Sequence, residues 1–181
     1  DFLVAFKTDA NKQPVVNNKY IEGINMTSTS QTSQYKTLVL KVGFNEEQHG
    51  YINPCQNVYD DIIPRYKDVD DYKPAVFYPT MPSDDKAHLC NINLVMGNAI
   101  TENGEVIENN MIVEFRYDHN GEQGWRWTPI RVRHDKTSEL RNGGRNYGNS
   151  YHVANSNWHT IHRPITIDMI TTGNNIVEEI N

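Results

Sequence analysis

Short segments in which polar and apolar residues alternate, separated by turn-forming residues, constrain the fold of this chain most strongly. The clearest pair, residues 111–117 and 125–133, flanks the dipeptide Asn120-Gly121. Alternation with period two is typical of β-strands that bury one face. Asn-Gly favours a tight hairpin connection. We therefore expect these two segments to pair as an antiparallel hairpin.

Other strands are predicted along the chain. Residues 35–44 alternate, so that Leu38, Leu40 and Val42 should share one face. A second Asn-Gly dipeptide, Asn103-Gly104, predicts a type I′ hairpin turn, in which both central residues have positive φ. Further candidate strands are residues 2–6, 75–78 and 87–92. This pattern predicts a mainly β fold, an OB-fold-like antiparallel barrel, with long loop insertions at residues 23–34 and 48–71.

The period of the sequence changes towards the C-terminus. Apolar residues recur at helical spacing at Tyr151, Ala154, Trp158 and Ile161. A helix is therefore expected there, with Trp158 as a packing anchor, and a second short helix is expected over residues 166–173. We divide the chain into an OB-fold domain, residues 1–140, and a segment of basic loop, C-terminal helix and linker, residues 141–181.

Charge is distributed unevenly. The chain of 181 residues has a net charge of −6 and a mean hydropathy of −0.70, which argues against a surface that binds nucleic acid all over. Basic residues nevertheless gather in one stretch of twenty residues, at Arg126, Arg131, Arg133, Lys136, Arg141 and Arg145. A local basic patch is therefore compatible with the net negative charge of the chain.

The two cysteines, Cys55 and Cys90, form no Cys-x-x-Cys pair. Two reduced thiols in an intracellular protein are the favoured interpretation, with a single disulfide left open. No segment is long and apolar enough for a membrane span, and no targeting signal is visible. Three histidines near residue 160 match no metal-ligand spacing, so we expect no metal site.

The run from Arg131 to Lys136 closes the last predicted strand. Arg131 and Arg133 should face away from Ile130 and Val132, with Asp135 and Lys136 directly beyond. Planar arginine forks and a lysine ammonium together suit phosphate oxygens. From spacing alone, a solvated charge cluster on an exposed strand is equally open.

Preceded by Trp and Pro, this run resembles the last ordered motif of covalent nucleotidyltransferases, the family of mRNA-capping guanylyltransferases and ATP-dependent polynucleotide ligases. Residues 1–4, 106–118 and 153–161 look like parts of the capping enzymes of large DNA viruses. The resemblance implies the C-terminal OB-fold domain of an mRNA guanylyltransferase. This domain would close over GTP and orient its β- and γ-phosphates while GMP is transferred to the 5′ end of RNA.

The resemblance also implies roles for single residues and partners. Arg133, Asp135 and Lys136 would be the catalytic phosphate clamp, and Arg131 and Arg126 would bind substrate. GTP and 5′-diphosphate RNA would be bound through a nucleotidyltransferase domain that this chain lacks, with Mg²⁺ required by the full enzyme and not held by this fragment. Triphosphatase and cap methyltransferase domains are implied as neighbours. The expected location is intracellular, in the cytoplasm of an infected host cell or in a virion, without a membrane.

One apparent motif is rejected. Lys7-Thr8-Asp9-Ala10 superficially matches the Lys-x-Asp-Gly motif of the family's nucleophile, but alanine replaces glycine and no companion motif follows. The isolated chain is therefore expected to be inactive. Two alternatives stay open: the OB domain of an ATP-dependent polynucleotide ligase, and a non-catalytic OB module that binds single-stranded nucleic acid. The Trp125-x-Trp127 flank favours capping.

Overall fold

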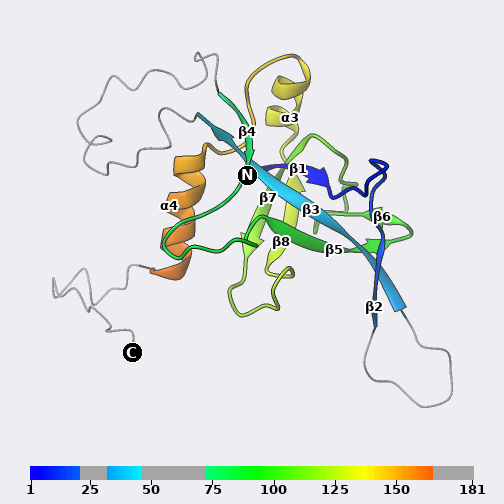
Figure 1. The fold of residues 1–181 in the computed structure, drawn as a ribbon. Helices are drawn as coiled ribbons and strands as arrows, with labels where there is room; N and C mark the ends of the chain where they lie inside the picture. The colour runs from blue at the N-terminus through cyan, green and yellow to red at the C-terminus, as the bar shows by residue number, and fades with distance from the viewer. Residues whose placement is uncertain (21–31, 46–71, 165–181) are drawn as a thin grey trace, which may run out of the picture.

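A computed structural model describes residues 1–20, 32–45 and 72–164 of the chain. Most of the elements are strands, and two helices follow them (Figure 1). The strands are β1 (Phe2–Phe6), β2 (Asn17–Tyr20), β3 (Thr32–Phe44), β4 (Lys73–Val76), β5 (Leu89–Val95), β6 (Asn98–Ala99), β7 (Met111–Tyr117) and β8 (Trp127–Val132). The helices are α3 (His134–Arg141) and α4 (Tyr151–His162).

All the strands of the described residues join one antiparallel sheet in the order β6-β5-β3-β1-β7-β8, with β2 and β4 paired to further parts of β3. The long β3, 13 residues, therefore runs through the whole sheet (Figure 1). Its alternating residues Leu38, Leu40 and Val42 are all fully buried. The predicted strand and its buried face are confirmed.

The sheet curls until β5 approaches β8. The backbone N–H of Asn91 donates to the carbonyl oxygen of Gly124 (2.7 Å), just before β8. The indole N–H of Trp127 donates to the carbonyl oxygen of Ala87 (2.7 Å), just before β5. These bonds hold the sheet as a curled half-barrel. The predicted mainly β, antiparallel, barrel-like fold with C-terminal helices is confirmed.

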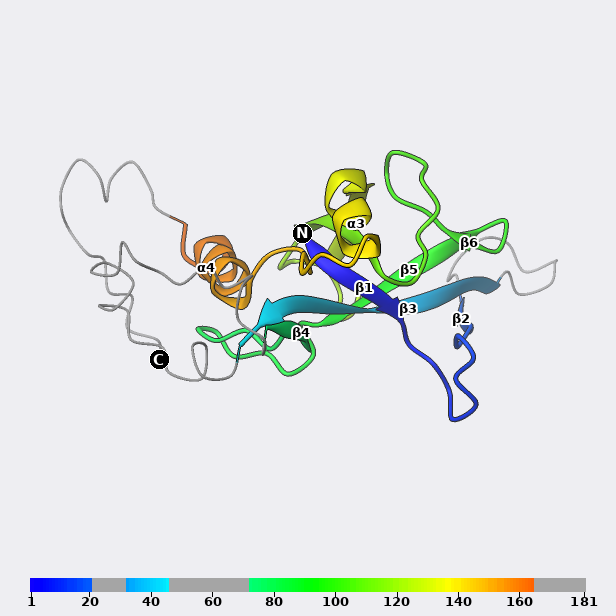
Figure 2. The ribbon, with the colours of Figure 1, turned by 90° about the horizontal axis from the view of Figure 1, so that it is seen from above.

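The curl gives the sheet an inner and an outer face. Phe2 and Val4 point inward with the alternating residues of β3, and α4 adds Trp158 to this core. On the outer face, Leu3 lies opposite both Lys41 of β3 and Ile112 of β7. Helix α3 packs on β7 at this outer face and lies over the start of β1 (Figure 2).

Helix α4 confirms the predicted C-terminal helix, and its attachment is specific. Trp158 is 1% exposed, and its indole N–H donates to the carbonyl oxygen of Pro82 (2.9 Å). Asn155 exchanges two hydrogen bonds of 2.9 Å with Thr80, one from the Thr80 backbone N–H and one to its hydroxyl. Tyr151 and Ala154 are buried on the same helix. None of the described helices is long and apolar enough to cross a bilayer.

The predicted pairing of β7 with β8 is confirmed. The tight connection expected at Asn120-Gly121 is wrong, because residues 118–126 lie between the two strands and neither residue has a positive φ. One detail of the register is wrong as well. Glu114 lies opposite Arg131, whereas the next residue, Phe115, lies opposite Pro129. Ile130 is thus the extra residue of a β-bulge, and it does not share the buried face of Val132. A bulge changes the side to which residues point on either side of it, and the sequence pattern does not reveal it.

Three other local predictions need correction. At Asn103-Gly104 the chain does turn, but only Gly104 has a positive φ (84°), so the turn is not type I′. The strand predicted to reach residue 133 ends at Val132, and α3 begins at His134. The predicted loop over 23–34 is wrong at its end, because residues 32–34 already belong to β3.

Several predictions fall outside the described residues. These are the insertion at 48–71, the helix over 166–173, and the state of Cys55. The division of the chain after residue 140 stays a prediction.

Cys90 offers a direct test of the core. Its thiol is fully buried and free, and burial raises its pKa to about 12. Because only the thiolate reacts readily, we expect a Cys55→Ser variant to resist Ellman's reagent at pH 8 and to react fully in guanidinium chloride. Rapid reaction without denaturant would show that β5 is not closed against β8.

Candidate functional site

The residues of the basic motif lie where β8 passes into α3. The backbone N–H of Arg133 donates to the carbonyl oxygen of Ile112 (2.7 Å). One turn later, the hydroxyl of Thr137 accepts a hydrogen bond from the backbone N–H of Ile112 (3.0 Å). Thr137 is 3% exposed. These bonds attach the first turn of α3 to β7 and fix the direction of the motif side chains.

Four charged side chains meet at the start of β1, and we call them the Asp1 cluster: Asp1, Arg133, Asp135 and Lys136. One oxygen of Asp1, Oδ2, accepts hydrogen bonds from Arg133 Nη1 (2.7 Å) and from Lys136 Nζ (2.6 Å). On its other edge, Arg133 donates from Nε (3.2 Å) and Nη2 (3.0 Å) to the two carboxylate oxygens of Asp135. The structure therefore brings together all three residues of the predicted clamp.

Exposure differs sharply within the cluster. The side chain of Asp1 is 9% exposed, those of Arg133 and Lys136 are each 24% exposed, and that of Asp135 is 67% exposed. The hydrogen bonds from Arg133 lower the pKa of Asp135 to about 2. Burial, followed by the nearby charge of Arg133, lowers the pKa of Lys136. The interior side of the cluster is thus fixed by Asp1, and its solvent side is occupied by Asp135.

The charges of the cluster balance, since two cations face two carboxylates. An anion arriving from solvent would therefore have to take the place of a carboxylate. Asp135 is the exposed partner, and it engages the planar fork of Arg133 that also suits a phosphate. The arrangement can exchange one carboxylate for one phosphate group without disturbing Asp1.

The other two predicted binding residues are placed differently. Arg131 lies beside the cluster on the outer face and forms an ion pair with Glu114, which lowers the pKa of that carboxyl. Arg126 precedes β8 and donates from Nε to the carbonyl oxygen of Gly121 (3.0 Å). Seven residues of roughly extended chain, about 23 Å, separate it from Arg133. The structure does not bring Arg126 to the cluster, and the roles of both arginines stay predictions.

Asp1 is the functional candidate that the sequence did not indicate. It stands 132 residues from Arg133 and 135 from Lys136, and no local spacing connects the two segments. Only the pairing of β1 with β7, and of β7 with β8, places them side by side. An aspartate just before a predicted strand is a common feature, so no signal singled it out.

The described ranges contain no group of three or more His, Cys, Asp or Glu side chains that could hold a metal ion. His159 Nε2 lies 2.7 Å from the carbonyl oxygen of Thr80. His162 Nδ1 lies 2.8 Å from the carbonyl oxygen of Trp158. These two histidines are thus engaged with backbone groups.

Comparison with known proteins gives one informative match. The chain is 29% identical over 175 residues to a protein described as a probable mRNA-capping enzyme of Acanthamoeba polyphaga mimivirus. The match covers 95% of this chain and 12% of that protein. No family model matches the chain, and no solved structure does. The similarity extends over nearly the whole chain, which is therefore similar to a segment of a viral protein described as a probable mRNA-capping enzyme, as the resemblance of its basic motif predicted.

Proposed function

We propose that this chain is the OB-fold domain of an mRNA guanylyltransferase, and that the Asp1 cluster contacts the β- and γ-phosphates of GTP during transfer of GMP to the 5′ end of RNA. The similarity to a capping enzyme supports the reaction class. The observation that carries the proposal is the convergence of Arg133, Asp135 and Lys136 at one half-exposed point of the outer face.

The chemistry follows from what each group can donate. Arg133 presents a fork of two N–H groups to Asp135, and this edge matches two oxygens of one phosphate. Lys136 adds a point charge next to it. As negative charge grows on departing pyrophosphate, fixed cations lower the energy of the transition state. Asp135 would release Arg133 when the phosphate arrives and hold it again afterwards.

Closure of a domain that carries these cations would explain how they act at one step only. In an open state only the nucleotide-binding pocket would contact the nucleotide. In the closed state Arg133 and Lys136 would contact it as well. Arg131 lies on the same face and is neutralised by Glu114, so it would add positive charge at the site only if that ion pair opened. The partners in this proposal are GTP and 5′-diphosphate RNA, bound through a nucleotidyltransferase domain. The triphosphatase and methyltransferase neighbours belong to the same proposal.

A resident Mg²⁺ does not fit the Asp1 cluster. Mg²⁺ prefers oxygen ligands, and both carboxylates of the cluster are occupied by arginine or lysine donors. We therefore assign any Mg²⁺ of the full enzyme to the nucleotide and its own domain, and no step here depends on it.

The nucleotide preference tests the proposal. In the larger capping enzyme that would contain this segment, we expect transfer of label from α-labelled GTP to the polypeptide and no transfer from α-labelled ATP. Labelling by ATP would assign the chain to the polynucleotide ligases. Absence of labelling by either nucleotide, with tight binding of single-stranded RNA, would leave a non-catalytic binding module.

The isolated chain should not form the covalent intermediate. A lysine that carries a nucleotide needs a desolvated pocket that lowers its pKa, whereas Lys7, the lysine of the rejected motif, is exposed. We expect no alkali-stable, acid-labile GMP adduct, the signature of a lysine phosphoramidate, when the 181-residue chain is incubated with α-labelled GTP and Mg²⁺. An adduct mapped to Lys7 by peptide sequencing would contradict this.

A further inference from the structure

A second concave site lies on the outer face, towards the other end of β1. It encloses about 510 Å³, and we call it the outer trough. Its floor consists of Ala5 and Val39, which lie directly opposite each other in β1 and β3. The other residues that line the trough are Phe6, Lys7, Thr8, Lys41, Asn109 and Asn110. The site is concave because the short side chains of alanine and valine lie between longer polar side chains.

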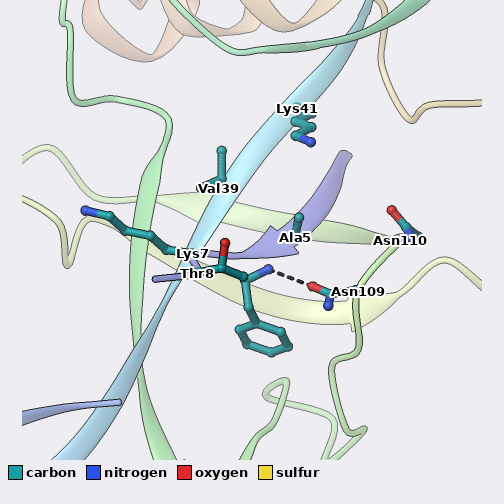
Figure 3. A pocket seen from close by; sticks show the side chains of 8 residues that line it. Ala5, Lys7, Thr8, Val39, Lys41, Asn109 and Asn110 are labelled. Atoms are coloured by element: carbon teal, nitrogen blue, oxygen red, sulfur yellow. Dashed lines mark hydrogen bonds between the residues drawn. The ribbon is translucent and has the colours of Figure 1, made fainter. Parts of the chain in front are cut away.

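The two lysines flank the floor from different sides. Figure 3 shows Lys7 and Lys41 on opposite sides of the pair formed by Ala5 and Val39, with the Lys7 side chain extending away from it. Lys41 follows Val39 by one step on the same face of β3, opposite Leu3. The positive charges are therefore spread along the trough rather than gathered at a single point.

The charged groups that line the trough are both cations. No carboxylate of the described residues forms an ion pair with Lys7 or Lys41, and none lines the trough. Asn109 uses its Oδ1 to accept the backbone N–H of Phe6 (2.8 Å), as Figure 3 also shows. Its amide NH₂ group is thereby left as a donor. In a chain of net charge −6, a carboxylate-free surface with two lysines favours an anionic ligand.

The outer trough and the Asp1 cluster lie on one face of the sheet. Asp1 directly precedes β1, and Leu3 and Ala5 are its outward-facing residues. At the usual rise of a strand, Asp1 and Ala5 are about 13 Å apart. An extended chain of phosphates could thus pass from the cluster, beside α3, into the trough.

We propose that the outer trough binds the phosphodiester backbone of single-stranded RNA, through Lys7, Lys41 and the amide of Asn109, with the RNA's 5′ end directed towards the Asp1 cluster, which it approaches after pyrophosphate has left. This inference rests on the proposed function, because that function supplies an RNA substrate. A single phosphate would be matched by converging cations, whereas separated cations over a flat floor match a repeating anion. The aromatic residue in the lining, Phe6, is partly buried and packs against the core, so we expect the contacts to be with the RNA backbone and to carry no base preference.

Binding of RNA to the 181-residue chain tests the trough without GTP, so that failure of GMP transfer and failure of this inference are separate results. The variant is Lys7→Ala/Lys41→Ala, and the matched control is Lys73→Ala/Lys86→Ala, which removes the same charge at exposed positions outside the trough. Fluorescence anisotropy would measure the affinity of labelled single-stranded RNA of two unrelated sequences across a salt series.

We expect the trough variant to bind both RNAs roughly tenfold more weakly at low salt. The slope of log K against log salt should fall by about 1.4, since each lost contact to a single strand contributes about 0.7. Equal losses in variant and control, or unchanged RNA binding in the variant, would overturn the proposal.

Inorganic tripolyphosphate distinguishes a free polyphosphate from the polymer. If the variant loses tripolyphosphate binding and keeps RNA binding, the trough takes free polyphosphate and the RNA assignment is wrong. If the variant loses RNA binding and tripolyphosphate competes only weakly with RNA in the unaltered chain, the RNA assignment stands.

Discussion

Replacing Lys136 by alanine is expected to lower the rate of enzyme–GMP formation in the larger capping enzyme by about a hundredfold, a typical loss when one donor to a transition-state anion is removed. Lys136 is 24% exposed and hydrogen-bonded to Asp1 Oδ2, so its ammonium is both held in place and reachable from solvent. The measurement is the initial rate of label transfer from α-labelled GTP.

A structural role for Lys136 would give a different pattern, and Asp1 separates the two explanations. If Lys136 only secures the start of β1 to α3, then Asp1→Asn, which removes the same ion pair, should lower the rate as much as Lys136→Ala. If Lys136 contacts phosphate, Asp1→Asn should lose much less. Lys86→Ala, at an exposed lysine in the turn before β5, is the matched control for lost charge. Equal losses in Lys136→Ala and Asp1→Asn would contradict the clamp.

The stability of these variants must be compared as well. The cations that donate to Asp1 Oδ2 are each 24% exposed, and in Lys136→Ala this oxygen keeps the hydrogen bond from Arg133. We therefore expect urea unfolding midpoints of Lys136→Ala and Lys86→Ala that differ little, so that a large difference in rate reports chemistry rather than unfolded protein.

The sequence pattern was sufficient for the elements whose partners are near in sequence. The β7–β8 hairpin, the buried alternation of β3 and helix α4 all follow from local periodicity. The pattern failed where tertiary pairing decides the geometry. The bulge at Ile130 appears only in the register of β8 against β7. Helix α3 has few apolar residues and is held instead by Thr137 on the backbone of Ile112, which no periodicity reveals.

In the candidate site, too, residues that are close in sequence could be predicted to associate, whereas residues that are distant in sequence could not. Arg133, Asp135 and Lys136 are within four residues of one another, so their association could be predicted from the motif alone. Asp1 joins them through two successive strand pairings. The outer trough depends on β1, β3 and the loop before β7 meeting on one face, and it carries no motif at all. Sites assembled from distant segments need the fold before they can be recognised.

The contacts that attach α4 to the sheet should contribute strongly to the stability of the fold, chiefly through Trp158. The ring of Trp158 lies among the rings of Phe77, Tyr117 and Trp127. Its indole N–H binds the loop that contains Pro82 (2.9 Å). One side chain therefore connects the helix, the inner face of the sheet and the segment between β4 and β5. Its removal would leave a cavity lined by rigid rings that cannot close around it.

We expect Trp158→Ala to lower the free energy of unfolding by about 3–5 kcal/mol, the usual range for a buried tryptophan. Trp158→Phe keeps a ring and loses the hydrogen bond to Pro82, so its loss should be clearly smaller. Trp125→Ala is the matched control, because Trp125 is only half-buried and packs on Tyr35 and Lys19 at the rim of the sheet. Urea denaturation followed by circular dichroism would measure all three variants. A loss in Trp158→Ala no larger than that in Trp125→Ala would mean that α4 is not part of the folded core, and the inner face would then be open along the side where the helix now lies.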